Sequence, residues 1–240
     1  MSSGDKIAIF AAHPPTDMMK TVRFISVVSF FLLLKAIPAS AQEFIVSPGV
    51  SVSNMMLWNQ TMEKGDGSTK VSFAATVRYK QGLGQKLSVQ SGLGVLNHGT
   101  KLITVNTVHI NGVLNTSIIT TEKYSLTSLS IPLLIGYEVT PEDSRFSLSV
   151  LGGADASYAL TGSYNRKVGL TETGFDLFES PVQFKRGDIS AVGGISVKSG
   201  GRGFELLYRR GLTDIATPDS RFAKARSFGV TLGFFLIMGS

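Results

Sequence analysis

The stretch SLSIPLLIGYEVTPEDSRFSLSVLGGADASYAL, residues 128–160, places two alternating segments on either side of a short polar turn. In the first segment Leu129, Ile131, Leu133, Ile135 and Tyr137 share one face, while the other face carries mainly small or polar residues. A period of two is the pattern of a β-strand. Long strands that are half apolar and half polar, and joined so tightly, suit neither a soluble core nor a transmembrane helix.

The same alternation recurs along the rest of the chain and gives about eight segments of roughly ten residues each, the length that a tilted membrane strand requires. The expected strands are residues 44–53, 71–80, 86–97, 128–138, 146–158, 188–198, 203–212 and 227–238. Each of them has an apolar face and a face of small or polar residues, so we expect one sheet with a single apolar surface.

The connections between these strands alternate between short and long. Short connections are expected at residues 81–85, 140–144 and 199–202, and long ones at 54–70, 97–122, 161–186 and 213–225. Short periplasmic turns and long external loops are typical of outer-membrane barrels. In lipid the sheet must close so that every backbone group is satisfied. The sequence therefore predicts an all-β fold, an eight-stranded antiparallel up-and-down transmembrane β-barrel with apolar residues outside and a lumen filled by side chains.

The N-terminal segment has the three parts of a secretory signal. Lys20 and Arg23 precede an apolar run at residues 24–34, and small residues follow up to Ala41. The run has about 11 residues, too short for a helix that crosses a membrane, which needs about 20. We expect residues 18–41 to be a cleaved signal peptide, residues 1–17 to be a non-native or mis-started extension, and residues 42–240 to be the outer-membrane barrel domain.

Composition argues against several kinds of site. The chain has no cysteine, which excludes disulfides and thiolate metal sites. The net charge is +6, but no basic cluster with interleaved aromatic residues is present, so no nucleic-acid partner is expected. The glycine-rich pieces GLGQ, SGLGVL and VLGGADASYAL lack the lysine and the helix of a phosphate loop. We expect no cofactor, and we interpret these glycines as relief of crowding in a small barrel.

The histidines of the mature chain do not indicate a metal or catalytic site. His98 and His109 are expected in or near a long loop and have no spaced metal-ligating partners, which favours a surface role. Some small outer-membrane barrels are enzymes, and His98, His109 and an acid such as Glu122 could meet. Nothing in the sequence sets the geometry that a nucleophile and its base require. We therefore expect no enzymatic activity.

Charged residues on the expected inner face form the candidate site. By strand parity, the inward-facing charges are Arg78, Lys80, Glu138, Asp155, Asp188, Glu205 and Arg209. Isolated buried charges are costly, so we expect these to pair as a structural network that fills the lumen, with a narrow polar path for a solute as the alternative. Glu205 and Arg209 are too far apart on one strand to pair with each other. Each is expected to pair with a neighbouring strand, where Asp188 and Glu138 are candidate partners for Arg209. Arg78 or Lys80 is expected to pair with an acid elsewhere in the ring.

Three motifs resemble the small outer-membrane β-barrel proteins called porin-family or PorT-like. SLSIPLLIGYEV resembles their central strand with its I-P-L-L pattern. GDISAVGGISVKSGGRGFELLYRRGLTDI is similar to their D-x-G-x-x-G-G stretch and the following strand, and FGVTLGFFL to their C-terminal strand. One departure is that the chain continues past Phe235 with Leu-Ile-Met-Gly-Ser instead of ending on an aromatic residue. The resemblance implies a Gram-negative outer membrane, contact with its lipid, and insertion by the barrel-assembly machinery.

Three functions are compatible with these patterns. The leading one is a non-enzymatic barrel whose loops serve binding, adhesion or assembly with an external or periplasmic protein, or which acts as a minor pore. The first alternative is a soluble periplasmic lipocalin-like barrel that binds an apolar ligand, which would need a polar outer face. The second alternative is a membrane-embedded enzyme acting on lipid or peptide, which would need a catalytic cluster at the rim.

Overall fold

The computed structural model describes residues 42–59, 64–65, 67–110, 113–141, 144–179 and 182–238. The expected extension and signal peptide, residues 1–41, lie outside the described residues, as do Glu142 and Asp143 of the expected turn at 140–144. Within the described part of the chain, no helix is long and apolar enough to cross a membrane.

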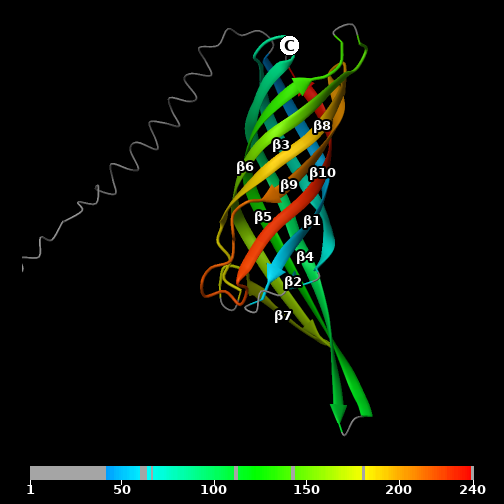
Figure 1. Ribbon diagram of the computed structural model, residues 1–240, viewed down its shortest axis with the longest axis vertical. Coiled ribbons are helices and arrows are strands. Elements are labelled where there is room, and N and C mark those ends of the chain that lie inside the picture. Colours follow the sequence, from blue (N-terminus) through cyan, green and yellow to red (C-terminus); the bar gives the residue numbers. More distant parts are fainter. Residues whose placement is uncertain are drawn as a thin grey trace, which may run out of the picture. The chain divides into compact units, whose positions relative to one another are not determined.

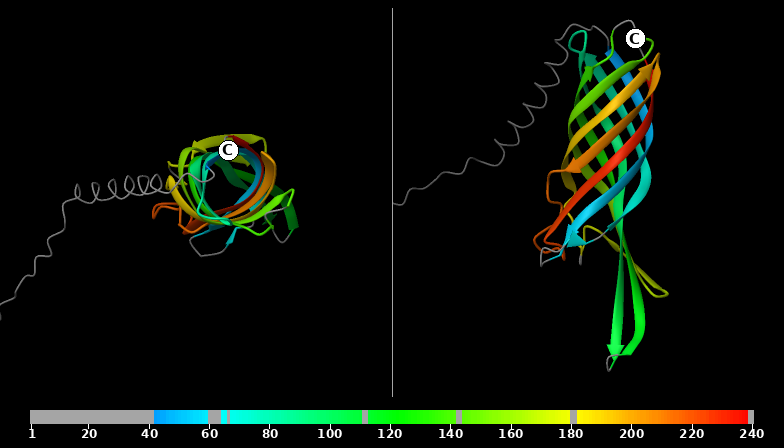
Figure 2. Two further views of the ribbon diagram at one scale, coloured as in Figure 1. Left: turned by 90° about the horizontal axis from the view of Figure 1, so that it is seen from above. Right: turned by 45° about the vertical axis from the view of Figure 1, so that its right-hand side comes forward.

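Across the described residues the chain forms strands β1 (Gln42–Trp58), β2 (Lys64–Gly65), β3 (Gly67–Gly82), β4 (Leu87–Ile110), β5 (Val113–Glu138), β6 (Ser147–Val168), β7 (Thr171–Asp176), β8 (Gly187–Ser199), β9 (Arg202–Gly211) and β10 (Lys224–Met238). Apart from β2 and β7, each strand pairs antiparallel with the next along the chain, and β10 pairs with β1 to close the ring (Figures 1 and 2). β2 pairs with β1, and β7 with β6. The predicted eight-stranded up-and-down barrel is confirmed.

The outer face of the ring is apolar and exposed. On β5 the exposed fraction is 49% for Ile131 and 57% for Ile135, and on β9 and β10 it is 59% for Phe204 and 56% for Leu232. The closing register sets Val50 of β1 opposite Leu232. Such a continuous apolar surface, here called the apolar belt, suits lipid and not water. The soluble lipocalin-like alternative is therefore wrong, because it needs polar residues on this face.

The inner face is packed with small residues and a few apolar ones. A Cβ atom added at Gly92 would lie 2.0 Å from the backbone oxygen of Val77, and one at Gly153 would lie 2.0 Å from that of Leu133. These glycines relieve crowding between strands, as predicted. Inside the lumen, the buried side chains of Leu134, Leu151, Val192 and Leu207 pack together.

The two ends of the barrel differ. The short-turn end holds the β3–β4, β5–β6 and β8–β9 connections and both ends of the described chain, and the β8–β9 turn uses Gly200 at a φ of 59°. At the opposite, long-loop end β4 and β5 continue as a paired hairpin well beyond the other strands (Figure 1). This corrects the predicted loops at 97–122 and 161–186, which are mostly strand. The Thr-, Val- and Ile-rich sequence from 97 to 122 pairs along β4 and β5, and residues 163–168 pair with β7.

Two connections fold over the lumen at the long-loop end. Residues 177–179, 182–186 and 213–225 form a structure that we call the cap, in which Phe184 and Ala216 make an isolated β-bridge. Its buried apolar residues are Leu177, Val182, Phe184, Ile215, Ala216, Phe222 and Ala225, which pack on Met55, Leu57, Tyr124, Leu126, Ala159 and Tyr164 of the barrel. The expected loop at 213–225 is thus a packed element, because its apolar residues find a core in the barrel mouth.

Candidate functional site

The deepest charges of the lumen form a buried ion pair. Arg78 of β3 and Glu205 of β9 are joined through Arg78 Nη2 and Glu205 Oε2, and their side chains are only 1% and 4% exposed. The hydroxyl of Ser47 on β1 donates to the other carboxylate oxygen at 2.7 Å. β1 and β10 lie between the two paired strands in the ring. The pair therefore spans the lumen, because the interior is narrow enough for long side chains to meet. Arg78 pairs with an acid elsewhere in the ring, as predicted, whereas the prediction that Glu205 pairs with a neighbouring strand is wrong.

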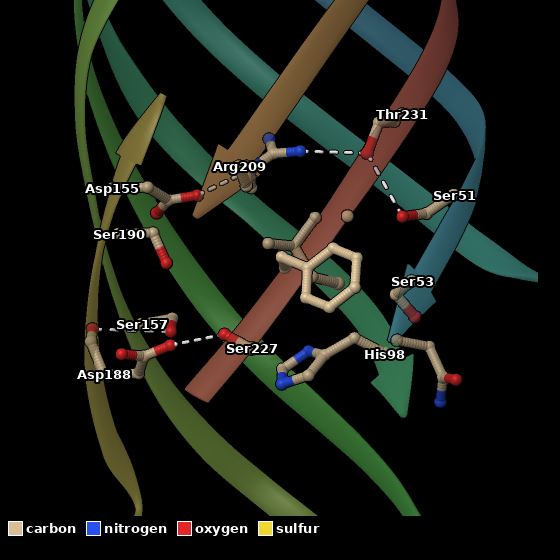
Figure 3. Close-up of a pocket in the computed structure, with 14 residues that line it drawn as sticks. Ser51, Ser53, His98, Asp155, Ser157, Asp188, Ser190, Arg209, Ser227 and Thr231 are labelled. Carbon is tan, nitrogen blue, oxygen red and sulfur yellow. Dashed lines mark hydrogen bonds and ion pairs between the residues drawn. The ribbon is translucent and has the colours of Figure 1, made fainter. Parts of the chain in front are cut away.

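A second ion pair lies nearer the long-loop end (Figure 3). Arg209 Nε of β9 lies 3.0 Å from Asp155 Oδ2 of β6, and its Nη1 donates to the Thr231 hydroxyl at 2.9 Å. The Ser130 hydroxyl donates to Asp155 Oδ1 at 2.8 Å. The expected partners of Arg209, Asp188 and Glu138, are wrong: β8 separates the paired strands, and parity alone does not fix the stagger around the ring.

The remaining predicted charges lie at other levels of the lumen. Lys80 pairs with Glu43 at 3.0 Å, and Lys198 reaches the same carboxylate at 2.5 Å. Asp188 accepts from the hydroxyls of Thr213 and Ser227, the latter at 2.8 Å.

Glu138 lies at the short-turn end, where the Thr140 hydroxyl is 3.5 Å from its carboxylate. The structure thus brings Arg78 together with Glu205 and Arg209 with Asp155, and it leaves Glu138 and Asp188 outside both pairs.

The space beside the two buried ion pairs is small. A cavity of about 40 Å³ is lined by Asp155, Asp188, Arg209 and His98 among others (Figure 3). A second of about 20 Å³ lies beside Arg78 and Glu205. A water molecule needs roughly 10–15 Å³ of such volume, so these cavities hold a few waters at most.

The two histidines occupy strand β4 and not a loop. His98 faces the inner cavity, so its expected surface role is wrong; the physical reason is that β4 continues past Asn97 with unbroken alternation. Among the interactions of the described residues, no hydrogen bond joins His98 to a serine or a carboxylate. His109 belongs to the paired part of β4, opposite Leu114 of β5.

A third charged cluster, unforeseen from the sequence, holds the cap to the barrel. Arg221 of the cap donates two hydrogen bonds to the carboxylate of Glu122 on β5, from Nη1 to Oε1 at 3.1 Å and from Nη2 to Oε2 at 2.5 Å. The hydroxyls of Tyr124 and Tyr164 donate to the same carboxylate at 2.9 and 2.8 Å. Arg166 Nε lies 3.8 Å from Glu122 Oε1.

Electrostatics at this cluster favour the charged pair. Burial raises the pKa of Glu122, but hydrogen bonds from Arg221 and Tyr164 outweigh it, so its pKa lies below the usual 4.5. Burial raises the pKa of the Tyr124 and Tyr164 hydroxyls, which stay protonated donors. Burial lowers the pKa of Arg221, but Glu122 more than compensates and the guanidinium stays charged.

The sequence carried partial signals for the residues that were missed. Glu43 directly precedes the first expected strand, so inward parity extended by one residue would have included it, and Lys198 is the last residue of the sixth expected strand and has the inward parity of Asp188. The partnership of Glu122 and Arg221 had no such signal, because 98 intervening residues carry no local pattern that joins them.

Residues 40–217 match the family model described as outer membrane protein beta-barrel domain. No curated protein matches the chain. Three solved structures are similar to it at low sequence identity.

The attachment invasion locus protein Ail of Yersinia pestis is 12% identical, with a TM-score of 0.36, over 83% of this chain and 100% of that one. Neisserial surface protein A is 10% identical, with a TM-score of 0.41, over 82% and 99%. The outer membrane protease OmpT of Escherichia coli is 9% identical, with a TM-score of 0.39, over 84% and 98%.

Proposed function

Because the chain belongs to the outer membrane protein β-barrel domain family and lies in the outer membrane, we propose that it is a non-enzymatic, closed barrel that presents a binding sheet to a partner protein outside the cell. The observation that carries this proposal is the extension of β4 and β5 beyond the ring. Long connections of such barrels are external, so the extension projects away from the cell.

The extension offers two features that bind proteins. On its outer side Val105 and Ile119 lie directly opposite each other and are 58% and 56% exposed, and Ile103 next to them is 52% exposed. They lie beyond Lys101 and Lys123, and hence outside the apolar belt. Exposed apolar groups that do not face lipid indicate an interaction surface.

The second feature is a free sheet edge. The pairing of β4 with β3 ends at Leu102, and among the described residues no other strand pairs with that edge of β4 from Ile103 to Ile110. A row of unpaired N–H and C=O groups accepts an added strand from a partner. Strand addition at β4, with side-chain contacts at Val105 and Ile119, is the binding mode that we propose.

The features of the lumen favour a closed barrel rather than an open pore. Two ion pairs cross it, the cavities beside those pairs hold only a few waters, and the cap fills the mouth with apolar side chains. The non-enzymatic part of the proposal has support in the partners of the acids near His98. Asp155 is engaged by Arg209 and Ser130, and Asp188 by Thr213 and Ser227.

The proposal is tested with a shortened hairpin. Thr104 and Thr120 are register partners, so residues 105–119 can be replaced by Asn-Gly, which forms a two-residue hairpin turn. We expect the refolded full chain to bind at least one member of a panel of extracellular-matrix and serum proteins, and the shortened chain to lose that binding. In planar bilayers neither protein should give conductance steps. Steady conductance by the full chain, with no panel binding, would favour the minor pore instead.

A further inference from the structure

The outward face of the same sheet carries a cluster of positive charge between the apolar belt and the hairpin extension. This lysine face consists of Lys70 of β3, Lys101 of β4, Lys123 of β5 and Lys167 of β6. Lys101 and Lys123 are direct cross-strand partners, and Lys123 is in turn opposite Asn165. Like charges directly opposite each other destabilise a sheet. The arrangement therefore has a cost that an anion between the lysines would offset.

Carboxylates do little to neutralise this face. None of the ion pairs found among the described residues includes any of the four lysines. Lys70 instead donates to two neutral groups, Asn97 Oδ1 at 2.9 Å and Ser125 Oγ at 2.6 Å. Glu172 of β7 lies opposite Lys167 and is the one acid among the described residues that line the hollows of this face. An excess of three positive charges remains.

The lysines border two adjoining hollows. One, of about 490 Å³, is lined by Lys70, Lys101, Lys123 and Val71 together with serine, threonine and asparagine side chains. The other, of about 260 Å³, is lined by Lys101, Lys123, Lys167, Thr121, Asn165 and Glu172. Because Lys101 and Lys123 belong to both hollows, one extended ligand with more than one anionic group can occupy them together.

The lysine face begins where the apolar belt ends. Val71 follows Lys70 directly, is 67% exposed, and lines the larger hollow. Lys123 lies six residues beyond Leu129 of the belt, about 20 Å along the strand at ~3.3 Å per residue. Strands of such barrels tilt by about 40°, so the lysines span roughly the first 15 Å above the hydrocarbon. A ligand that fits this surface has acyl chains against the apolar belt and anionic groups against the lysine face.

We propose that the lysine face binds a phosphorylated glycolipid of the outer leaflet, with acyl chains along Val71 and phosphate groups on the lysines. Lysine ammonium groups are point charges suited to phosphate, and the serine, threonine and asparagine side chains provide hydrogen bonds to sugar hydroxyls. A glycerophospholipid with one phosphate would engage only part of the face. The inference does not depend on the proposed protein partner, which contacts the free edge of β4 together with Val105 and Ile119.

The test compares two triple variants that lose equal charge. The first changes Lys101, Lys123 and Lys167 to Gln; the control changes Lys86, Arg145 and Arg202, three exposed cations at the short-turn end, to Gln. Binding of bisphosphorylated lipid A to the refolded full chain in detergent is measured by calorimetry. At about fivefold per lysine, we expect the first variant to lose about a hundredfold in affinity, and the control to keep wild-type affinity.

Further arms identify the ligand. Dephosphorylated lipid A should bind wild type as weakly as the bisphosphorylated form binds the lysine variant, and added salt should weaken only phosphate-dependent binding. Inorganic phosphate and a soluble sulfated oligosaccharide should not compete at matched concentration. Equal lipid A affinity of wild type and lysine variant, or equal competition by the soluble sulfated glycan, would overturn the proposal.

Folding is controlled independently of binding. Removing the opposed charges of Lys101 and Lys123 should leave the free energy of unfolding in lipid-free detergent unchanged or slightly higher. A variant with Arg at the same three positions should keep lipid A binding within about threefold, because the charge is retained. Loss of binding in the Arg variant as well would contradict recognition by charge.

Discussion

At the scale of single residues, the ion pair of Arg78 and Glu205 is the most sensitive point of the lumen. Both side chains are almost fully buried, and Ser47 is the other described partner of the carboxylate. Replacing Arg78 with Leu leaves a buried acid without its cation, and we expect a loss of about 3–5 kcal/mol in the free energy of unfolding from lipid vesicles in urea.

A double variant separates the pair from its surroundings. Changing Arg78 and Glu205 both to Leu removes the two charges together, and we expect it to recover most of the lost stability. Arg209→Leu should cost less than Arg78→Leu, because Asp155 keeps the Ser130 hydroxyl and borders a cavity that admits water. If Arg78→Leu were neutral, the lumen would solvate its charges, and the open-pore interpretation would gain support.

At the scale of elements, the cap depends on the charge of Glu122. The pKa of this carboxyl is lower in the folded protein than its usual 4.5, so the carboxylate stabilises the closed cap above that value. The stabilisation is lost as pH falls below 4.5 and through the lowered pKa. The backbone carbonyl of Trp58, the single tryptophan, accepts a hydrogen bond from the backbone N–H of Ala223 in the cap at 2.9 Å. We expect a red shift of its fluorescence on acidification in this range.

Glu122→Gln is the matched control for this titration. The amide cannot hold Arg221 as an ion pair at any pH, so the variant should show the shifted fluorescence already at neutral pH and a smaller change on acidification. Tyr164→Phe removes one hydroxyl donor and should move the midpoint to higher pH, because one of the groups that lower the pKa of Glu122 is lost. An unchanged midpoint in Glu122→Gln would assign the transition to other acids.

At the scale of the whole molecule, the outward face must tolerate lipid. Leu232 lies in the belt opposite Val50 and Leu206. Leu232→Arg should cost about 2–4 kcal/mol near the bilayer midplane, again in urea unfolding from vesicles. Leu170, which is 100% exposed in the β6–β7 turn, provides the control, and Leu170→Arg should be neutral. Equal effects at the two positions would mean that the belt does not face lipid.

The orientation of the molecule in the membrane gives a further prediction. An epitope tag inserted between Gly169 and Leu170, in the β6–β7 turn, should bind antibody on intact cells. A tag between Gly200 and Gly201, in the β8–β9 turn, should bind only after the outer membrane is permeabilised. The reverse result would place the hairpin extension in the periplasm and exclude an external partner.

Alternation of residue types is a property of short segments of the sequence. It therefore determined the features of the fold that depend on single segments, namely the strands, their faces and the short connections. Leu129 and Ile135 face outward, Arg78 and Glu205 face inward, and the short connections follow the strands as the pattern indicates. Glycines such as Gly92 could be assigned to tight packing for the same reason. Strand ends at the long-loop end could not be read, because pairing outside lipid relaxes the demand for an apolar face.

Only the closed ring decided which side chains meet. The stagger between strands sets the height of each residue, and the curvature brings β3 across from β9, so Arg78 meets Glu205 and Arg209 meets Asp155. The cap followed the same logic, since Arg221 reaches Glu122 only once the barrel mouth exists. The relative heights of residues on different strands, and the closure of the ring, depend on the pairing of all eight strands together. No single segment of the sequence determines them.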